Sequence, residues 1–223
     1  MRPLKITAYF LTPPAMGHIC LHFDGVLAHI LARERTDFWN LPEEVVQLNL
    51  ELPLKCIRNE NGDFFWCASA LLFPEWYVSI IYKRFEVGAI DYLSDRKKQI
   101  NIGSGKFRHW FISMPYSPIP EGIFYAYGDR KEIERLLPHI TSLGKKGAVG
   151  YGFVREWKVE EIEEDFSVVK DGVAMRPIPI WAVEEAESQM IGTYKPPYWD
   201  RSGAGIIVPA GAKVRLKDGC KVA

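Results

Sequence analysis

Apolar and polar residues alternate along several stretches of the chain, and such alternation is typical of β-strands. The pattern predicts strands over residues 4–11, 45–57, 63–73, 76–85, 106–114, 122–128 and 153–162. Two other stretches, 22–33 and 129–140, repeat apolar residues at helical spacing, and Asp24 is placed to cap the first helix. An Asn-Gly pair at 61–62 predicts a hairpin between the second and third strands.

The order of these elements predicts the fold class. Strand, helix and strand are followed by an interruption, and then by strand, helix and strand, which is the split βαβ order of the ferredoxin-like α+β fold. The interruption covers about 82–110 and is predicted as a thumb-like β excursion from the sheet. We therefore expect one domain over 1–165 with this insertion, followed over 166–223 by a Pro-rich, irregular tail that packs on the domain or on a partner.

Composition narrows the class of protein. With 223 residues, 48% of them hydrophobic and 25% charged, the chain is long enough and apolar enough to bury a core. No apolar run approaches the roughly 20 residues of a membrane helix, and the first residues lack a signal-peptide pattern. The four cysteines form no C-x-x-C pair, which argues against a zinc or redox motif. We expect a cytoplasmic protein with no cofactor, no metal and no membrane contact.

Charge is unevenly distributed although the formal net charge is zero. Acidic residues dominate 159–187, whereas cations interleaved with aromatic residues dominate 83–109, as in a protrusion that binds RNA phosphates and stacks its bases. Ordinary solvated faces are the alternative explanation of both runs. The candidate RNA-binding residues in the basic run are Lys83, Arg84, Arg96, Lys97, Lys98, Lys106, Arg108, His109 and Trp110.

A glycine-rich stretch over 142–154 is the strongest candidate for a binding site. It contains Gly144, Lys145, Lys146, Gly147, Gly150, Tyr151 and Gly152. Glycines let a backbone approach a ligand, and lysines add positive charge for phosphates. The stretch follows a predicted helix and precedes a strand, the reverse of a P-loop or Rossmann loop, which argues against nucleotide hydrolysis. A glycine-rich turn that binds no ligand remains the alternative.

Three histidines lie in or beside the first predicted helix, at His18, His22 and His29. Histidine is the commonest general acid or base near neutral pH. His22 and His29 are seven residues apart, so they would share one face if both were helical, and no ligand set for a metal accompanies them. A structural or RNA-contacting role and a catalytic role both stay open.

Several stretches together resemble a known family. The residues at 21–28, 66–70, 145–153, 175–179 and 196–199 are similar to motifs of the CRISPR-associated RAMP superfamily, and more narrowly of its type IV effector subunits that hold the 5′ handle of the CRISPR RNA (crRNA). The resemblance implies ferredoxin-like, RRM-related domains with a glycine-rich loop. It spans nearly the whole chain.

The resemblance also implies a function. The protein would be a non-catalytic subunit of a ribonucleoprotein that grips the crRNA handle between glycine loop and sheet and caps the backbone subunits. Its partners would be crRNA, the backbone and large subunits, and target DNA within the complex. At the matching positions, the resemblance implies that the handle is contacted by Lys145, Lys146, Gly147, Gly150 and Tyr151. It likewise implies that the residues acting in the thumb are Arg96, Lys97, Lys98, Arg108 and Trp110.

Two other functions remain open. RAMP proteins include endoribonucleases that use a histidine and the 2′-hydroxyl of RNA without a metal, and His18, His22 or His29 could serve such a reaction. An unrelated RRM-like RNA-binding protein is the second alternative. Its signature would be aromatic residues in the RNP pattern on central strands, which the sequence lacks.

Overall fold

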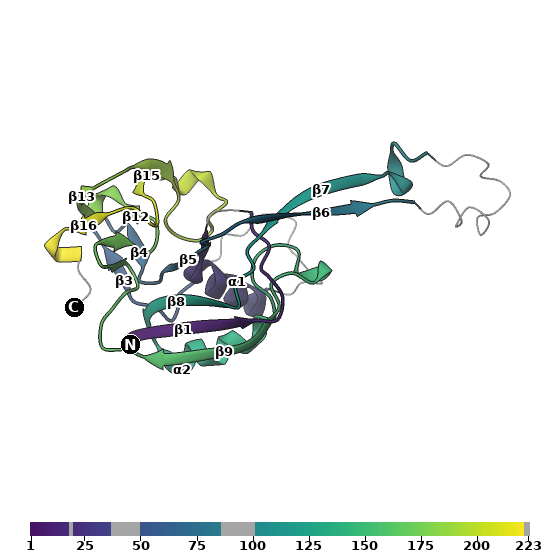
Figure 1. Ribbon diagram of the computed structural model, residues 1–223. Helices are drawn as coiled ribbons and strands as arrows, with labels where there is room; N and C mark the ends of the chain where they lie inside the picture. Colours follow the sequence, from purple (N-terminus) through teal and green to yellow (C-terminus); the bar gives the residue numbers. More distant parts are fainter. Residues whose placement is uncertain (18–19, 37–49, 86–100, 221–223) are drawn as a thin grey trace.

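The centre of the fold is a three-stranded antiparallel sheet. The computed structural model describes residues 1–17, 20–36, 50–85 and 101–220. In it β1 (Arg2–Phe10) lies between β8 (Glu121–Gly128) and β9 (Val154–Glu161), and both pairings are antiparallel (Figure 1). β1 takes the central position because its alternate side chains are apolar, and Leu4, Ile6 and Ala8 are fully buried.

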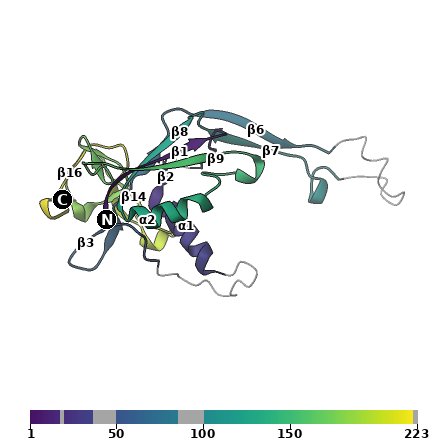
Figure 2. The same cartoon turned by 90° about the horizontal axis from the view of Figure 1, so that it is seen from below.

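Two helices cover one face of this sheet, as Figure 2 shows. They are α1 (Phe23–Arg35) and α2 (Arg130–Leu136), and their apolar stripes join the buried side of the sheet in one core. Phe23 of α1 meets Phe124 of β8 with ring centroids 5.1 Å apart. The carboxylate of Asp129 caps α2 by accepting hydrogen bonds from the amides of residues 131 and 132. The predicted strands at 4–11, 122–128 and 153–162 and the first predicted helix are confirmed. The second predicted helix is confirmed as far as Leu136 and then continues as a 3-10 helix, η3 (Leu137–His139).

The predicted hairpin at the Asn-Gly turn is also confirmed. β3 (Cys56–Arg58) pairs with β4 (Phe64–Trp66), but the predicted strand over 63–73 is broken, and its second half is β5 (Ala70–Leu72), paired with β2 (Cys20–His22). The break occurs because the chain changes partners there, and Ala68 forms a bridge with Ala126 of β8. Of the strand predicted over 45–57, residues up to 49 lie outside the described part, and in the remainder only the end belongs to β3.

A long hairpin projects from the body of the protein (Figures 1 and 2). It is formed by β6 (Tyr77–Lys83) and β7 (Trp110–Tyr116), and a 3-10 helix, η2 (Gly105–Phe107), precedes β7. The strand predicted over 106–114 therefore begins later than expected. The excursion predicted at about 82–110 covers only the outer end of the hairpin, because its paired strands start at Tyr77 and finish at Tyr116.

The C-terminal region is not the irregular tail that its prolines predicted. It contains seven short strands and a buried cluster of its own, which includes Ile178 and Val208 together with Phe65 from β4. The prolines fall mostly between strands, where no ladder hydrogen bond is lost. The strands are β10 (Val169–Lys170), β11 (Val173–Ala174), β12 (Ile178–Pro179), β13 (Val183–Ala186), β14 (Met190–Gly192), β15 (Gly205–Val208) and β16 (Val214–Leu216).

A polar cluster fastens this region to the β3–β4 turn. Asp63 accepts hydrogen bonds from the Tyr194 hydroxyl, from Lys195 Nζ at 2.7 Å and from Trp181 Nε1 at 3.1 Å. Burial raises the pKa of the Asp63 carboxyl, but the hydrogen bonds from Lys195 and Tyr194 outweigh it and leave the pKa below its usual value.

Among the described residues, no helix is both long and apolar enough to span a membrane.

Candidate nucleic-acid interface

The glycine-rich stretch forms a loop that is closed at its neck and tied to the segment after β1. Ser142 and Phe153 form a bridge at the neck, where the Leu143 amide donates to the Gly152 carbonyl at 2.9 Å. The Lys145 amide donates to the carbonyl of Ala15 at 2.6 Å. The top of the loop is a 3-10 helix, η4 (Gly147–Val149). The loop is thus a defined structure built on the end of β1 and the start of β9.

Much of the loop's backbone is already hydrogen-bonded within the protein, which changes the expected mode of binding. The amides that donate to carbonyls of the chain itself are those of Leu143, Lys145, Val149, Gly150, Tyr151 and Gly152. A nest of free amides around phosphate oxygens is therefore not the main feature of the loop. Contacts to an anion have to come chiefly from its side chains and from the remaining amides.

The glycines of the loop differ in why they are needed. Gly152 has φ = +67°, and a Cβ there would lie 2.0 Å from the Leu143 carbonyl oxygen, so it shapes the neck. Gly150 has φ = +99°, but a Cβ there would meet nothing within 4 Å. The exposed Gly144 lies on the loop's first arm, and the partly exposed Gly147 begins η4. Of the glycines with positive φ in this loop, Gly150 is therefore the one that has open space beside it for a ligand.

The two lysines of the loop supply its charge. Both are exposed, and none of the ion pairs within the described ranges involves Lys145 or Lys146. Lys146 adopts left-handed backbone angles, with φ = 63°. A Cβ at Gly17 would lie 2.1 Å from Lys145 Nζ, so this ammonium group lies directly against the Gly17 backbone. Two unneutralised cations next to each other favour an anionic partner.

The glycine loop adjoins the base of the projecting hairpin. Ala15 forms bridges with both Tyr116 of β7 and Lys145 of the loop. Tyr77 and Tyr116 lie opposite each other at the base of the hairpin with ring centroids 6.0 Å apart, and Tyr151 of the loop follows at 6.2 Å from Tyr116. Residues from three distant parts of the sequence therefore form one surface. We refer to Tyr77, Tyr116 and Tyr151 as the tyrosine row.

The other predicted RNA-binding residues that the structure describes lie at the far end of the hairpin. Six residue steps of about 3.4 Å separate that end from its base, so the two groups of candidates are roughly 20 Å apart. Two of them stabilise the hairpin itself, because Lys83 Nζ donates to the Lys106 carbonyl and His109 Nε2 accepts from the Phe85 amide, each at 2.9 Å. Exposed at this end are Arg84, Lys106, Arg108 and Trp110. Arg96, Lys97 and Lys98 lie outside the described residues.

One face of the hairpin is apolar and open. Its pairing register places Val78, Ile80, Tyr82 and Phe111 on the face opposite to Tyr77, and these four side chains are 61–78% exposed. We call them the apolar hairpin face. Exposed apolar groups that adjoin one another in this way mark interaction surfaces. The sequence did not reveal this face, because the alternation of a projecting hairpin is the same as that of a sheet strand.

Of the three candidate histidines, the structure describes His22 and His29, and it does not bring these two together. His22 lies at the N-cap position of α1 with extended backbone angles, so it and His29 do not share a helical face. Its ring stacks on Tyr198 at 3.8 Å between centroids, and its Nε2 lies 3.6 Å from Cys20 Sγ. His29 is exposed on α1, and its pKa is lowered by partial burial and then by the charge of Arg33. His18 lies outside the described residues.

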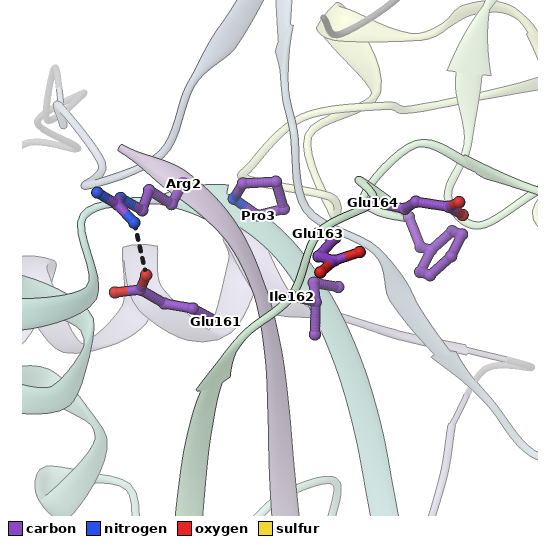
Figure 3. A pocket seen from close by; sticks show the side chains of 7 residues that line it. Arg2, Pro3, Glu161, Ile162, Glu163 and Glu164 are labelled. Carbon is purple, nitrogen blue, oxygen red and sulfur yellow. Dashed lines mark hydrogen bonds and ion pairs between the residues drawn. The ribbon is translucent and has the colours of Figure 1, made fainter.

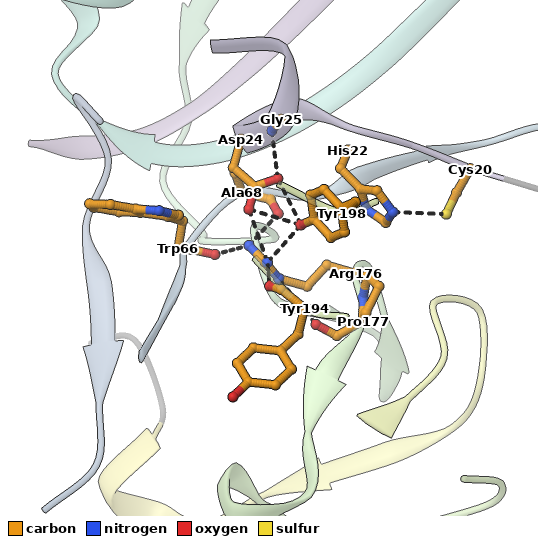
Figure 4. A network of polar contacts seen from close by, with 10 residues as sticks. All are labelled: Cys20, His22, Asp24, Gly25, Trp66, Ala68, Arg176, Pro177, Tyr194 and Tyr198. Atoms are coloured by element: carbon orange, nitrogen blue, oxygen red, sulfur yellow. Dashed lines mark hydrogen bonds and ion pairs between the residues drawn. The ribbon is translucent and has the colours of Figure 1, made fainter. Parts of the chain in front are cut away.

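Asp24 is not the helix cap that the sequence predicted. It lies in the first turn of α1, fully buried, and its Oδ2 forms an ion pair with Arg176 Nη2 at 3.1 Å (Figure 4). The Tyr198 hydroxyl lies 2.9 Å from both of its oxygens. Burial, followed by the negative charge of Asp24, raises the pKa of the Tyr198 hydroxyl well above its usual value, so that it serves as a hydrogen-bond donor.

Arg176 is the hub of this network. Its guanidinium, which is 0% exposed, donates to the carbonyls of Trp66, Ala68 and Tyr194 as well as to Asp24. The four stretches at 21–28, 66–70, 175–179 and 196–199, which the family resemblance had picked out separately, meet here (Figure 4). They form a buried structural joint between α1 and the C-terminal region, not a binding surface.

A group of acidic residues at the end of β9 lies at the opposite end of the sheet from the glycine loop. A hollow of about 680 Å³ is lined by Glu161, Glu163 and Glu164 at the end of β9, together with Arg2 and Phe166 (Figure 3). Arg2 pairs with Glu161 at 3.0 Å. The β1–β9 register places Glu161 beside Leu4 and Val154 beside Phe10, so the strands separate this acidic end from the basic loop. A polyanion is repelled at one end and attracted at the other.

All four cysteines are free thiols, and burial affects two of them most. Among the described residues, no group of three or more His, Cys, Asp or Glu side chains could hold a metal ion. Burial raises the pKa of the Cys20 thiol to about 11 and that of Cys67 to about 12. Both thiols are protonated near neutral pH, which leaves them poor nucleophiles and poor ligands.

Comparison with known proteins places the chain in a family. A search of curated proteins finds no match. The model of the family described as "CRISPR type IV associated protein Csf3" matches residues 78–208, which is more than half of the chain and runs from the hairpin through the glycine loop to β15. The protein therefore belongs to the Csf3 family of type IV CRISPR-associated proteins.

Proposed function

We propose that the protein is a non-catalytic RNA-binding subunit of a type IV CRISPR effector ribonucleoprotein, and that it grips the 5′ handle of the crRNA. The observation that carries this proposal is the junction of the glycine loop with the base of the hairpin. Two exposed lysines without acidic partners adjoin three tyrosines there. A site for single-stranded RNA combines cations, which contact phosphates, with aromatic rings, on which bases stack.

We further propose that residues 1–165 form a ferredoxin-like RAMP domain. The strand order supports this, because β9, β1 and β8 lie side by side and the bridge between Ala68 and Ala126 extends the row beyond β8. Every pairing in that row is antiparallel, and both helices cover one face. Across the sheet of a ferredoxin-like fold, the spatial order of the four strands is fourth, first, third and second. The row of β9, β1, β8 and the segment at Ala68 matches this order.

The same proposal assigns protein partners. A hairpin whose apolar face is exposed and which projects from the body suits contact with a neighbouring subunit, and we assign the apolar hairpin face to the backbone subunit that the protein caps. The large subunit and target DNA are further partners within the complex. Handle binding would thus take place at the base of the hairpin and subunit contact along its length.

Replacing both lysines of the loop with alanine is expected to weaken binding of handle RNA by roughly tenfold at 0.15 M salt. Each lysine lost removes about one phosphate contact, so the slope of log K against log salt should also decrease by about 1.4 for a single strand. The measurement is a fluorescence anisotropy titration of labelled RNA at several salt concentrations. The RNA carries the common 5′ sequence of the small RNAs that copurify with the protein.

The matched control is Lys213→Ala/Lys217→Ala. These lysines are exposed at the C-terminal end of the structure, remote from the hairpin, and their removal changes the net charge equally. We expect this variant to keep the affinity and the salt slope of the wild type. An equal loss in both variants would indicate nonspecific attraction, and no loss in the Lys145→Ala/Lys146→Ala variant would contradict the assignment of the loop.

The non-catalytic part of the proposal has a test of its own. We expect repeat RNA incubated with the purified protein in EDTA to remain intact, because the His22 ring is stacked on Tyr198 instead of facing the glycine loop site. Gel analysis of end-labelled RNA provides the measurement. Discrete products that disappear in His22→Ala would establish the endoribonuclease alternative. Products that persist in that variant and also in His18→Ala and His29→Ala would point to a contaminating nuclease.

A further inference from the structure

We propose that the tyrosine row is a stacking site for one unpaired base of the bound RNA, with Tyr77 as its exposed platform. This inference rests on the proposed function and adds two residues, Tyr77 and Tyr116, to the site. It also specifies the ligand, since only a single-stranded or splayed nucleotide can present a base face to a protein ring.

The ring geometry leaves a face free for a base. Neighbouring rings of the row are tilted by 34° and 50°, with centroids 6.0 and 6.2 Å apart, so they touch at their edges and do not cover one another as a stack would. Tyr77 is 50% exposed, whereas Tyr116 and Tyr151 are partly buried. A base can therefore reach the exposed ring of Tyr77 at one end of the row, whereas Tyr116 and Tyr151 pack against the protein at the other end.

The platform is fixed where the hairpin joins the body. Tyr116 lies opposite Tyr77 in the strand register and also forms a bridge with Ala15. The next residue, Ser117, is buried and its amide donates to the Pro14 carbonyl at 3.1 Å. A platform whose backbone is fixed in this way loses little freedom when a base stacks on it, which favours binding.

The two loop lysines beside the row select a nucleotide over an apolar peptide. One carboxylate, that of Glu75, contacts the row by accepting a hydrogen bond from the Tyr77 hydroxyl at 3.4 Å. Ala15 lies between Tyr116 and Lys145, so their backbones are two strand spacings apart, about 10 Å. A base on the row therefore has its phosphates within reach of both loop lysines. The acidic hollow lies at the other end of β1 and β9, where it cannot neutralise them. Stacking and phosphate contact are the two interactions that single-stranded nucleic-acid sites combine.

The test places 2-aminopurine, a fluorescent base, at each position of the handle RNA in turn. We expect one position to be quenched on binding, and Tyr77→Leu to restore its fluorescence and weaken binding roughly 5- to 150-fold, the range for loss of one stacked base. Tyr77→Phe should retain quenching and bind within about twofold of wild type. The salt slope should not change in either variant, unlike that of the lysine variant, because no phosphate contact is lost.

The control is Trp199→Leu, which removes a 78% exposed aromatic side chain from the C-terminal region and should bind RNA as the wild type does. Wild-type affinity and quenching in Tyr77→Leu and Tyr151→Leu, with weakened binding in Lys145→Ala/Lys146→Ala, would overturn the stacking site and leave the proposed function intact. Absence of RNA binding by the wild-type protein would overturn both.

Discussion

Arg176→Leu is expected to lower the free energy of unfolding by about 3–5 kcal/mol, the cost of breaking one side of a buried ion pair. The substitution leaves the Asp24 carboxylate buried with only the Tyr198 hydroxyl and the Gly25 amide as hydrogen-bond donors. It also removes a donor to the carbonyls of Trp66, Ala68 and Tyr194, of which the Trp66 carbonyl keeps the Ala68 amide as a donor at 3.0 Å. Each buried acceptor left unsatisfied adds to the loss.

Urea unfolding followed by circular dichroism measures this loss, and for a chain of this size the melting temperature should decrease by roughly 6–20 °C. A double-mutant cycle with Asp24→Asn tests the origin of the effect. Because the neutral amide needs no counter-charge, Arg176→Leu should cost less in the Asp24→Asn background than in the wild type. Equal costs in both backgrounds would show that the guanidinium acts through the carbonyls and not through the ion pair.

The elements of the central sheet could be predicted because their signals are local. Alternation defines β1, β8 and β9, and the helical repeat over 129–140 defines α2. The Arg176 network could not be predicted in this way. Its two charged partners are 152 residues apart, and Asp24 taken alone looks like an ordinary helix cap. The family resemblance pointed to the stretches that form the network but not to their contact.

The candidate site shows the same limit. The sequence identified Lys145, Lys146 and Tyr151, because glycines and lysines cluster within a few residues. It missed Tyr77 and Tyr116, which reach the loop only when the hairpin folds and Ala15 joins its base to Lys145. The length of the hairpin was also missed, since its strands alternate like those of the sheet. Long-range pairing thus decides which aromatic residues belong to the site.

Gly152→Ala and Gly150→Ala form a matched pair. We expect the first to lower mainly the stability of the protein and the second to lower mainly its affinity for RNA. Both glycines have positive φ, and a left-handed backbone costs an alanine about 1–2 kcal/mol. At Gly152 the added Cβ would also lie 2.0 Å from the Leu143 carbonyl oxygen, so the neck of the loop must move and the total loss of stability should reach about 3 kcal/mol or more. At Gly150 the space is open, and only the backbone cost should appear.

RNA affinity separates the roles of the two glycines further. Gly150→Ala places a methyl group on the open side of the loop, where a bound RNA backbone would pass, so we expect it to weaken handle binding while most of the stability is retained. Gly152→Ala adds no group on the open side of the loop. It should weaken handle binding only as far as the movement of the neck displaces Tyr151 and the two lysines. Unfolding and anisotropy titrations on the two variants give both quantities. Full RNA affinity in Gly150→Ala would mean that this glycine shapes the turn and that the RNA contacts the loop through its side chains alone.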